Sequence, residues 1–127
     1  MIYWLLLAMI FCHIVDDYYL QGVLAKMKQK KWWEENSSNK KYKYDYIVAL
    51  ICHSFSWTFM IMLPIAIFKE FDLGILYLLY PINCVVHCIT DDLKANKLKI
   101  NLIADQSIHL FQIILTWLVF YMIEVNL

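Results

Sequence analysis

The chain has 127 residues, of which 62% are hydrophobic and 17% aromatic, and its eleven lysines balance its eleven acidic residues. A soluble domain is nearer half apolar, and a formal charge of zero gives no electrostatic reason to expect a nucleic acid as partner. Only two glycines and two prolines are present, which disfavours a turn-rich all-β fold. The composition therefore indicates a helical protein embedded in a membrane.

Four apolar stretches approach the roughly 20 residues that a transmembrane helix needs. The first is short before Asp16 and Asp17, but apolar residues continue beyond them. The predicted spans are about 1–22, 46–68, 73–92 and 103–124. No internal repeat or second domain is visible, so we expect residues 1–127 to form one all-α domain, an integral membrane four-helix bundle.

The distribution of lysines predicts the orientation of this bundle. Seven lysines lie in the loop 26–45 and three between the third and fourth spans, whereas Lys69 stands alone between the second and third. Because positive charge accumulates on the cytoplasmic side, we expect the N- and C-termini on the outer side of the cell inner membrane. Lysines beside a span also attract anionic lipid headgroups, so membrane lipids are the expected partners.

Ionisable residues inside the spans form a pattern of histidines and aspartates. Such residues are costly in a membrane and usually mark a functional site. Residues four apart share one helix face, and three spans carry a pair with this spacing: His13 with Asp17, His87 with Asp91, and Asp105 with His109. His53 adds a fourth histidine from the second span. In the predicted topology all of them lie toward the cytoplasmic leaflet, so we expect them to meet there.

Two other interpretations apply to the same residues. A single buried histidine such as His53 is often a hydrogen-bonded core residue, and the whole set could be a polar network that fixes helix register. Asp16 would point about 100° away from Asp17 on an α-helix, so Asp16 is a weaker candidate, as is Asp92 beside Asp91.

Imidazole and carboxylate ligands favour a divalent transition metal, zinc first, with manganese or iron as alternatives. The set would suffice for one ion or for two ions bridged by a carboxylate. The expected metal ligands are His13, His53, His87, Asp91 and His109. Asp17 and Asp105 are the expected catalytic carboxylates, and the residues expected to bind an anionic part of the substrate are Gln21, Lys26 and Lys94.

At these motifs the chain resembles a family of small bacterial and phage integral membrane proteins known as a domain of unknown function. The matching segments are residues 13–21 (HIVDDYYLQ), 87–94 (HCITDDLK) and 105–109 (DQSIH). The resemblance covers nearly the whole chain but implies no activity. The doubled Asp16-Asp17 departs from the pattern, in which a small residue usually precedes the second aspartate. A looser likeness, in residue type, is to membrane-bound metal-dependent hydrolases with intramembrane histidines.

These observations predict a membrane-embedded metal-dependent hydrolase whose His/Asp site lies near the cytoplasmic leaflet and acts on a lipid or a phosphorylated amphiphile. The alternatives are a small ion or proton transport protein and a non-catalytic membrane interaction protein. Asn83, Gln112 and Thr116 are too few to line a path through the outer half of the membrane. A homodimer would help to bury the polar face.

Overall fold

The computed structural model describes residues 2–37 and 39–126, and within them the chain forms six α-helices and no β-strand. The all-α prediction is therefore confirmed. The helices are α1 (Ile2–Val15), α2 (Leu24–Met27), α3 (Lys30–Asn36), α4 (Asp45–Phe68), α5 (Leu79–Ala95) and α6 (Leu102–Asn126). A π-helical turn and two 3-10 turns complete them: η1 (Asp16–Leu20), η2 (Lys40–Tyr42) and η3 (Gly74–Leu78).

Three segments in the described part of the chain are long and apolar enough to cross a membrane: Tyr3–Leu20, Lys40–Phe68 and Leu102–Val125. The fourth predicted span, 73–92, is divided in the structure between η3 and α5, and α5 has only 17 residues. A membrane location is thus plausible, whereas the four-span topology with both termini outside stays a prediction.

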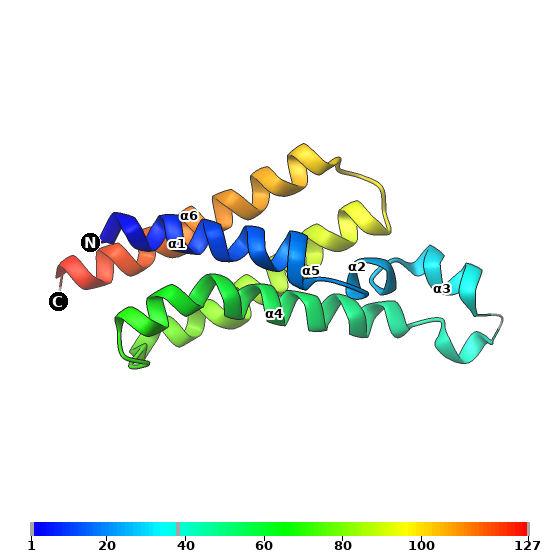
Figure 1. Ribbon diagram of the computed structural model, residues 1–127, viewed down its shortest axis with the longest axis horizontal. Coiled ribbons are helices and arrows are strands. Elements are labelled where there is room, and N and C mark those ends of the chain that lie inside the picture. Colours follow the sequence, from blue (N-terminus) through cyan, green and yellow to red (C-terminus); the bar gives the residue numbers. More distant parts are fainter. Residues whose placement is uncertain (1, 38, 127) are drawn as a thin grey trace.

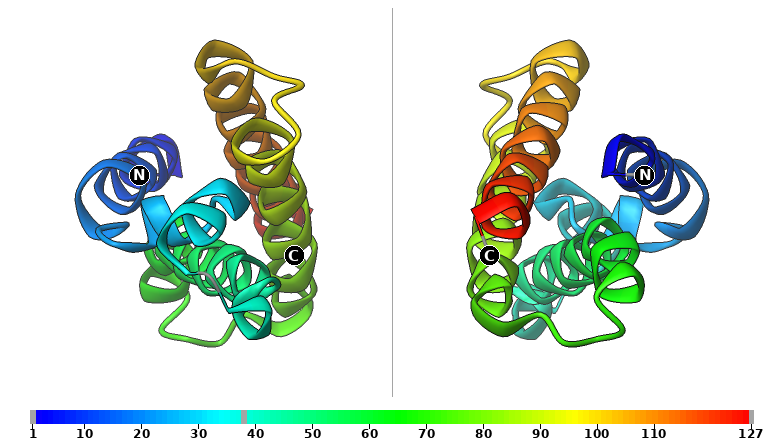
Figure 2. Two further views of the ribbon diagram at one scale, coloured as in Figure 1. Left: turned by 90° about the vertical axis from the view of Figure 1, so that its right-hand side faces the viewer. Right: turned by 90° about the vertical axis from the view of Figure 1, so that its left-hand side faces the viewer.

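The four longest helices pack in a ring, because α1 and α5 each pack against both α4 and α6. α1 begins and α6 ends at one end of the molecule, and α2 and α3 lie at the opposite end (Figure 1). Views along the long axis show α1 and α4 on one side and the α5–α6 pair on the other (Figure 2). This arrangement lets side chains from all four helices meet in the interior.

The interior is apolar toward the end where α1 begins, with α4 and α6 supplying much of it. Its fully buried members are Met9, Trp57, Ile61, Ile65, Ile113 and Phe120. The outside is apolar as well, since Phe11, Phe55 and Phe111 are each more than half exposed. Exposed aromatic residues on several helices are expected of a surface that faces lipid rather than water.

Three buried polar residues join α5 to α6 by hydrogen bonds. Asn83 Nδ2 donates to Thr116 Oγ1 (2.9 Å), and Gln112 Nε2 donates to the Asn83 carbonyl oxygen (2.7 Å). Hydrogen bonds of this kind hold helices together where no water is available. These three residues therefore pair with one another across the helix interface.

The chain leaves α1 through η1 and then reverses at Gly22. η1 has the i→i+5 hydrogen bond of a π-helix, from the Gln21 N–H to the Asp16 carbonyl oxygen (2.9 Å). Gly22 has a φ of +49°, a left-handed conformation that glycine adopts without strain. The turn carries the chain into α2, which packs against α4.

Candidate metal centre

The histidines and aspartates predicted from the sequence meet in one buried cluster, contributed by α1 with η1, α4, α5 and α6. His53 is 1% exposed, and His87 and His109 are 0% exposed. Ionisable side chains removed from water require charged or hydrogen-bonding partners. The contacts within the cluster therefore decide what it can bind.

Asp17, His53 and His87 form a first group of possible metal ligands, with one ligand atom from each lying within 4.8 Å of the others. His53 Nε2 is 3.2 Å from His87 Nε2 and 3.3 Å from Asp17 Oδ1. In a tetrahedral zinc site with metal–ligand bonds of about 2.0–2.1 Å, neighbouring ligand atoms are about 3.3 Å apart. The observed spacing therefore suits a metal ion.

His87, Asp91 and His109 form a second group that satisfies the same distance limit. His109 Nε2 lies 3.4 Å from Asp91 Oδ1 and 3.5 Å from Asp105 Oδ1. The other oxygen, Asp91 Oδ2, lies 3.4 Å from His53 Nε2. Asp91 therefore stands between the two groups, with one carboxylate oxygen toward each.

Several buried atoms that face this cluster lack a hydrogen bond of acceptable geometry among the described residues. They include Asp17 Oδ1, Asp105 Oδ1 and His109 Nε2. A buried polar atom without a partner costs about 1–3 kcal/mol. A cation would satisfy carboxylate oxygens and imidazole nitrogens together, so the residues present fit a bound metal ion.

His13 lies beside the ligand groups and outside both of them. Trp57 Nε1 donates to His13 Nδ1 (2.8 Å), and His13 Nε2 lies 3.1 Å from Gln106 Oε1. Both ring nitrogens are therefore engaged by neighbours. His13 is predicted from the sequence to be a metal ligand, but these contacts suit a residue that positions the ligands around it.

Gln106 links the two outer carboxylates, a role that sequence reasoning missed. Its Nε2 donates to Asp17 Oδ2 (3.3 Å) and to Asp105 Oδ2 (3.1 Å). Each aspartate thereby keeps its Oδ1 directed at a histidine of the cluster. Hydrogen bonds that orient ligands in this way are typical of metal sites. The Asp-Gln dipeptide was visible in the sequence, but nothing local indicated that its glutamine reaches α1.

Asp16 is buried and acts on His53, which the sequence did not predict. Asp16 Oδ2 lies 3.6 Å from His53 Nδ1, and Ser56 Oγ donates to Asp16 Oδ1 (2.6 Å). Asp16 and Asp17 thus face opposite nitrogens of one imidazole. A carboxylate behind a histidine is the usual support for a metal-binding imidazole. The expectation that Asp16 points away assumed an α-helix, whereas the structure has a π-helical turn there.

Two lysines contact the carboxylates. Lys28 is buried with its Nζ 2.5 Å from Asp91 Oδ2, and Lys94 Nζ lies 2.6 Å from Asp105 Oδ2. Lys26, which the sequence favoured, is exposed and does not line the cavity at the cluster. Asn96, just after α5, explains why Lys28 and not Lys26 lies at the cluster. Its side chain hydrogen-bonds to the Lys28 carbonyl oxygen and to the Lys30 N–H and so holds this segment against α5.

A cavity of about 390 Å³ opens beside the cluster. Its polar wall includes Asp17, Gln21, Lys28, Asp91, Lys94 and Gln106. A larger hollow of about 510 Å³ between α1 and α6 is lined mainly by apolar residues such as Ile10, Ile14 and Leu110. The two hollows share Tyr18 and Gln106, so an apolar groove adjoins a charged cavity.

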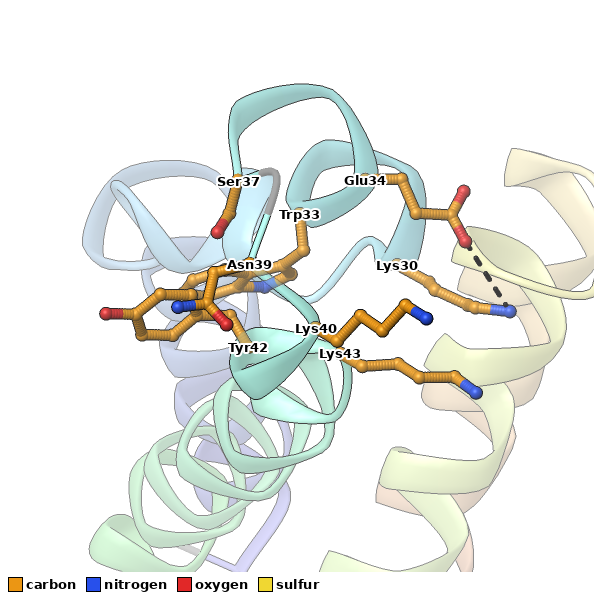
Figure 3. Close-up of a pocket in the computed structure, with 8 residues that line it drawn as sticks. All are labelled: Lys30, Trp33, Glu34, Ser37, Asn39, Lys40, Tyr42 and Lys43. Carbon is orange, nitrogen blue, oxygen red and sulfur yellow. Dashed lines mark ion pairs between the residues drawn. The ribbon is translucent and has the colours of Figure 1, made fainter.

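A separate surface pocket of about 310 Å³ lies between α3 and η2. Lys30, Lys40 and Lys43 extend toward one side of it, and the stacked rings of Trp33 and Tyr42 lie on the opposite side (Figure 3). Glu34 Oε1, 3.6 Å from Lys30 Nζ, offsets the charge of only one of these three lysines. The pocket therefore has an excess of positive charge. It is made of other residues than the His/Asp cluster, and we name it the lysine pocket.

No protein-family model, curated protein or solved structure matches the chain. The fold and the site nevertheless define a class: an all-helical protein with three possible membrane spans and a buried His/Asp cluster that could hold a metal ion. The resemblance to the family of small membrane proteins stays a prediction.

Proposed function

We propose that the protein is a metal-dependent hydrolase of the cell inner membrane that acts on a phosphorylated amphiphile at the cytoplasmic leaflet. The observation that carries the proposal is the position of Asp91, whose two oxygens face different histidines while Lys28 approaches from the cavity. Imidazole with carboxylate favours zinc, with manganese or iron as alternatives. The four-span topology with both termini outside is part of the same proposal.

The chemistry follows from the donor set. A divalent ion in the cluster would lower the pKa of water to about 7. Asp17 or Asp105 would accept the proton of this water, and the water oxygen would bond to phosphorus as the ester P–O bond breaks. Lys28 and Lys94 supply positive charge where the phosphoryl oxygens gain negative charge. The leaving alkoxide would take this proton from the protonated aspartate and depart as the alcohol.

The two adjoining hollows support an amphiphilic substrate. The phosphate group would occupy the charged cavity beside Lys28 and Lys94, and the apolar chain would lie in the groove between α1 and α6. Such a substrate reaches the site laterally from the lipid, without crossing the membrane.

Phosphate release from phosphatidic acid in mixed micelles tests this function. We expect release by the parent protein loaded with zinc or manganese, and its loss in His109→Ala. Lys28→Gln should raise KM about 10- to 100-fold, because a hydrogen bond to a charged group contributes about 1.5–3 kcal/mol. Lys26→Gln is the matched control and should leave KM unchanged. A metal-loaded parent that releases no phosphate would contradict the hydrolase proposal and favour ion transport.

We further propose that the lysine pocket binds the headgroup of an anionic lipid. Each lysine near a membrane surface contributes about 1 kcal/mol to such binding. The double variant Lys40→Gln/Lys43→Gln should therefore raise the apparent Kd for phosphatidylglycerol about 30-fold, as measured by native mass spectrometry. Lys97→Gln/Lys99→Gln removes the same charge elsewhere and should change little. Equal weakening in both double variants would show a diffuse attraction and no pocket.

A further inference from the structure

We propose that the cluster holds two divalent ions bridged by the Asp91 carboxylate. The inference rests on the proposed metal-dependent function and adds the number of ions and their ligands. Asp91 Oδ2 lies 3.4 Å from His53 Nε2, and Asp91 Oδ1 lies 3.4 Å from His109 Nε2. Both distances match those between ligand atoms that share an ion, about 3.3 Å. A carboxylate with each oxygen at this distance from a different imidazole is placed to bridge.

The first ion has four ligand atoms available. They are Asp17 Oδ1, His53 Nε2, His87 Nε2 and Asp91 Oδ2. The bond lengths of a tetrahedral site predict that these atoms lie about 3.3 Å apart, and His53 Nε2 is within 3.4 Å of the other three. On the other side of the imidazole, Asp16 Oδ2 lies 3.6 Å from His53 Nδ1 and places a negative charge behind this ligand.

The second ion has three protein ligands: His109 Nε2, Asp91 Oδ1 and Asp105 Oδ1. Three protein ligands leave a position for water or substrate, as in catalytic zinc sites. His109 Nε2 and Asp105 Oδ1 are both buried without a hydrogen bond among the described residues. These two atoms are thus available to bind an ion. The fourth coordination position of that ion would be the place where water or substrate binds.

The stacking of two imidazoles sets the separation between the ions. His87 and His109 lie with ring centroids 4.2 Å apart and planes at 29°, and Trp57 stacks on His87 at 4.1 Å. Nearly parallel imidazoles, each bound to one ion, hold the two ions at a similar distance. Ions about 3.5–4 Å apart are characteristic of two-metal hydrolytic sites.

Formal charge is consistent with two ions and a phosphate substrate. The cluster has four carboxylates, from Asp16, Asp17, Asp91 and Asp105, and two ammonium groups, from Lys28 and Lys94. With neutral histidines the sum is two negative charges. Two divalent ions change it to two positive charges, which a dianionic phosphate monoester neutralises.

The lysine on the bridging carboxylate does not exclude an ion. Each carboxylate oxygen has two lone pairs. Asp91 Oδ2 can therefore accept a hydrogen bond from Lys28 with one lone pair and bind the first ion with the other. The same reasoning lets Asp17 Oδ1 or Asp105 Oδ1 bind an ion and still accept a proton from water. The lysine then bridges the metal centre and the cavity where phosphate would bind.

Metal stoichiometry tests the inference. The full chain, purified in mild detergent without a histidine tag and loaded with zinc, should contain two ions by elemental analysis. Asp17→Asn and Asp105→Asn should each retain one ion, and Asp45→Asn, at the start of α4, should retain two. One ion in the parent would overturn the two-ion inference, and phosphate release by that one-ion protein would leave the proposed function standing. No ion in the parent would overturn both.

A spectroscopic measurement tests the inference on the parent protein directly, with one variant as the reference for an isolated ion. Two Mn²⁺ ions about 4 Å apart couple magnetically, so the manganese-loaded parent should give a coupled electron paramagnetic resonance spectrum. Asp105→Asn should give the six-line signal of an isolated ion. An isolated signal in the fully loaded parent would overturn the inference.

Discussion

We expect the replacement of Asp91 by asparagine to abolish metal binding and phosphate release, and the same replacement at Asp92 to change neither. Asp91 faces His53 through one oxygen and His109 through the other, so its loss removes a ligand from both of the proposed ions. We expect kcat to fall by about 10³-fold or more, because Lewis-acid stabilisation contributes several kcal/mol to the transition state. Elemental analysis and the phosphate-release assay measure the two effects.

Asp92 is a close control because it is the next residue on α5 and undergoes the same chemical change. Its Oδ2 lies 2.8 Å from Lys97 Nζ, and this hydrogen bond raises the pKa of the exposed Lys97. Asp92 Oδ1 accepts from Asn96 Nδ2 (3.0 Å), so the Asp92 side chain pairs with Lys97 and Asn96 and with no proposed metal ligand among the described residues. A variant Asp91→Asn that kept its metal and its activity would contradict the assignment of Asp91.

Loss of folding must be separated from loss of metal in this variant. Asp91→Asn leaves the buried Lys28 ammonium without its carboxylate, which costs about 3–5 kcal/mol. The double variant Lys28→Met/Asp91→Asn removes both charges, so we expect it to fold like the parent while still lacking metal. Thermal unfolding in detergent distinguishes the two variants.

If the cluster holds a metal ion, a chelator should lower the melting temperature, and added zinc should restore it. The cluster then keeps buried carboxylates and imidazoles without enough opposing charge. An ion present at 100 times its Kd stabilises the folded state by about 2.7 kcal/mol, which corresponds to a shift of about 10 °C for a chain of this size. Tryptophan fluorescence measures the transition, since Trp57 stacks on His87 inside the core.

The chelator experiment has an internal control in the variant that cannot bind metal. Lys28→Met/Asp91→Asn, which lacks the metal and leaves no unpaired buried charge, should melt at the same temperature with and without chelator. An unchanged melting temperature in the parent would indicate a hydrogen-bonded network that needs no ion. The cluster would then fix helix register, as buried polar networks do in other membrane proteins.

The sequence by itself determined the class of the fold and the residue types of the site. Long apolar stretches with few glycines can satisfy their backbone groups as helices, and the spacing of four residues placed His87 with Asp91 and Asp105 with His109 on shared faces. These are local properties of a helix. The structure brings both pairs, with Asp17 and His53, into one cluster.

Only the tertiary structure decided which neighbours act on that cluster. The π-helical turn brought Asp16 to His53, and Asn96 selected Lys28 over Lys26 by binding the backbone on either side of it. Gln106 on α6 reaches Asp17 after the end of α1. The contacts of His13 with Trp57 and Gln106 hold His13 beside the ligands. Spacing along the chain specifies the face of one helix, whereas such contacts depend on the rotation and depth of helices relative to one another, and packing alone determines these.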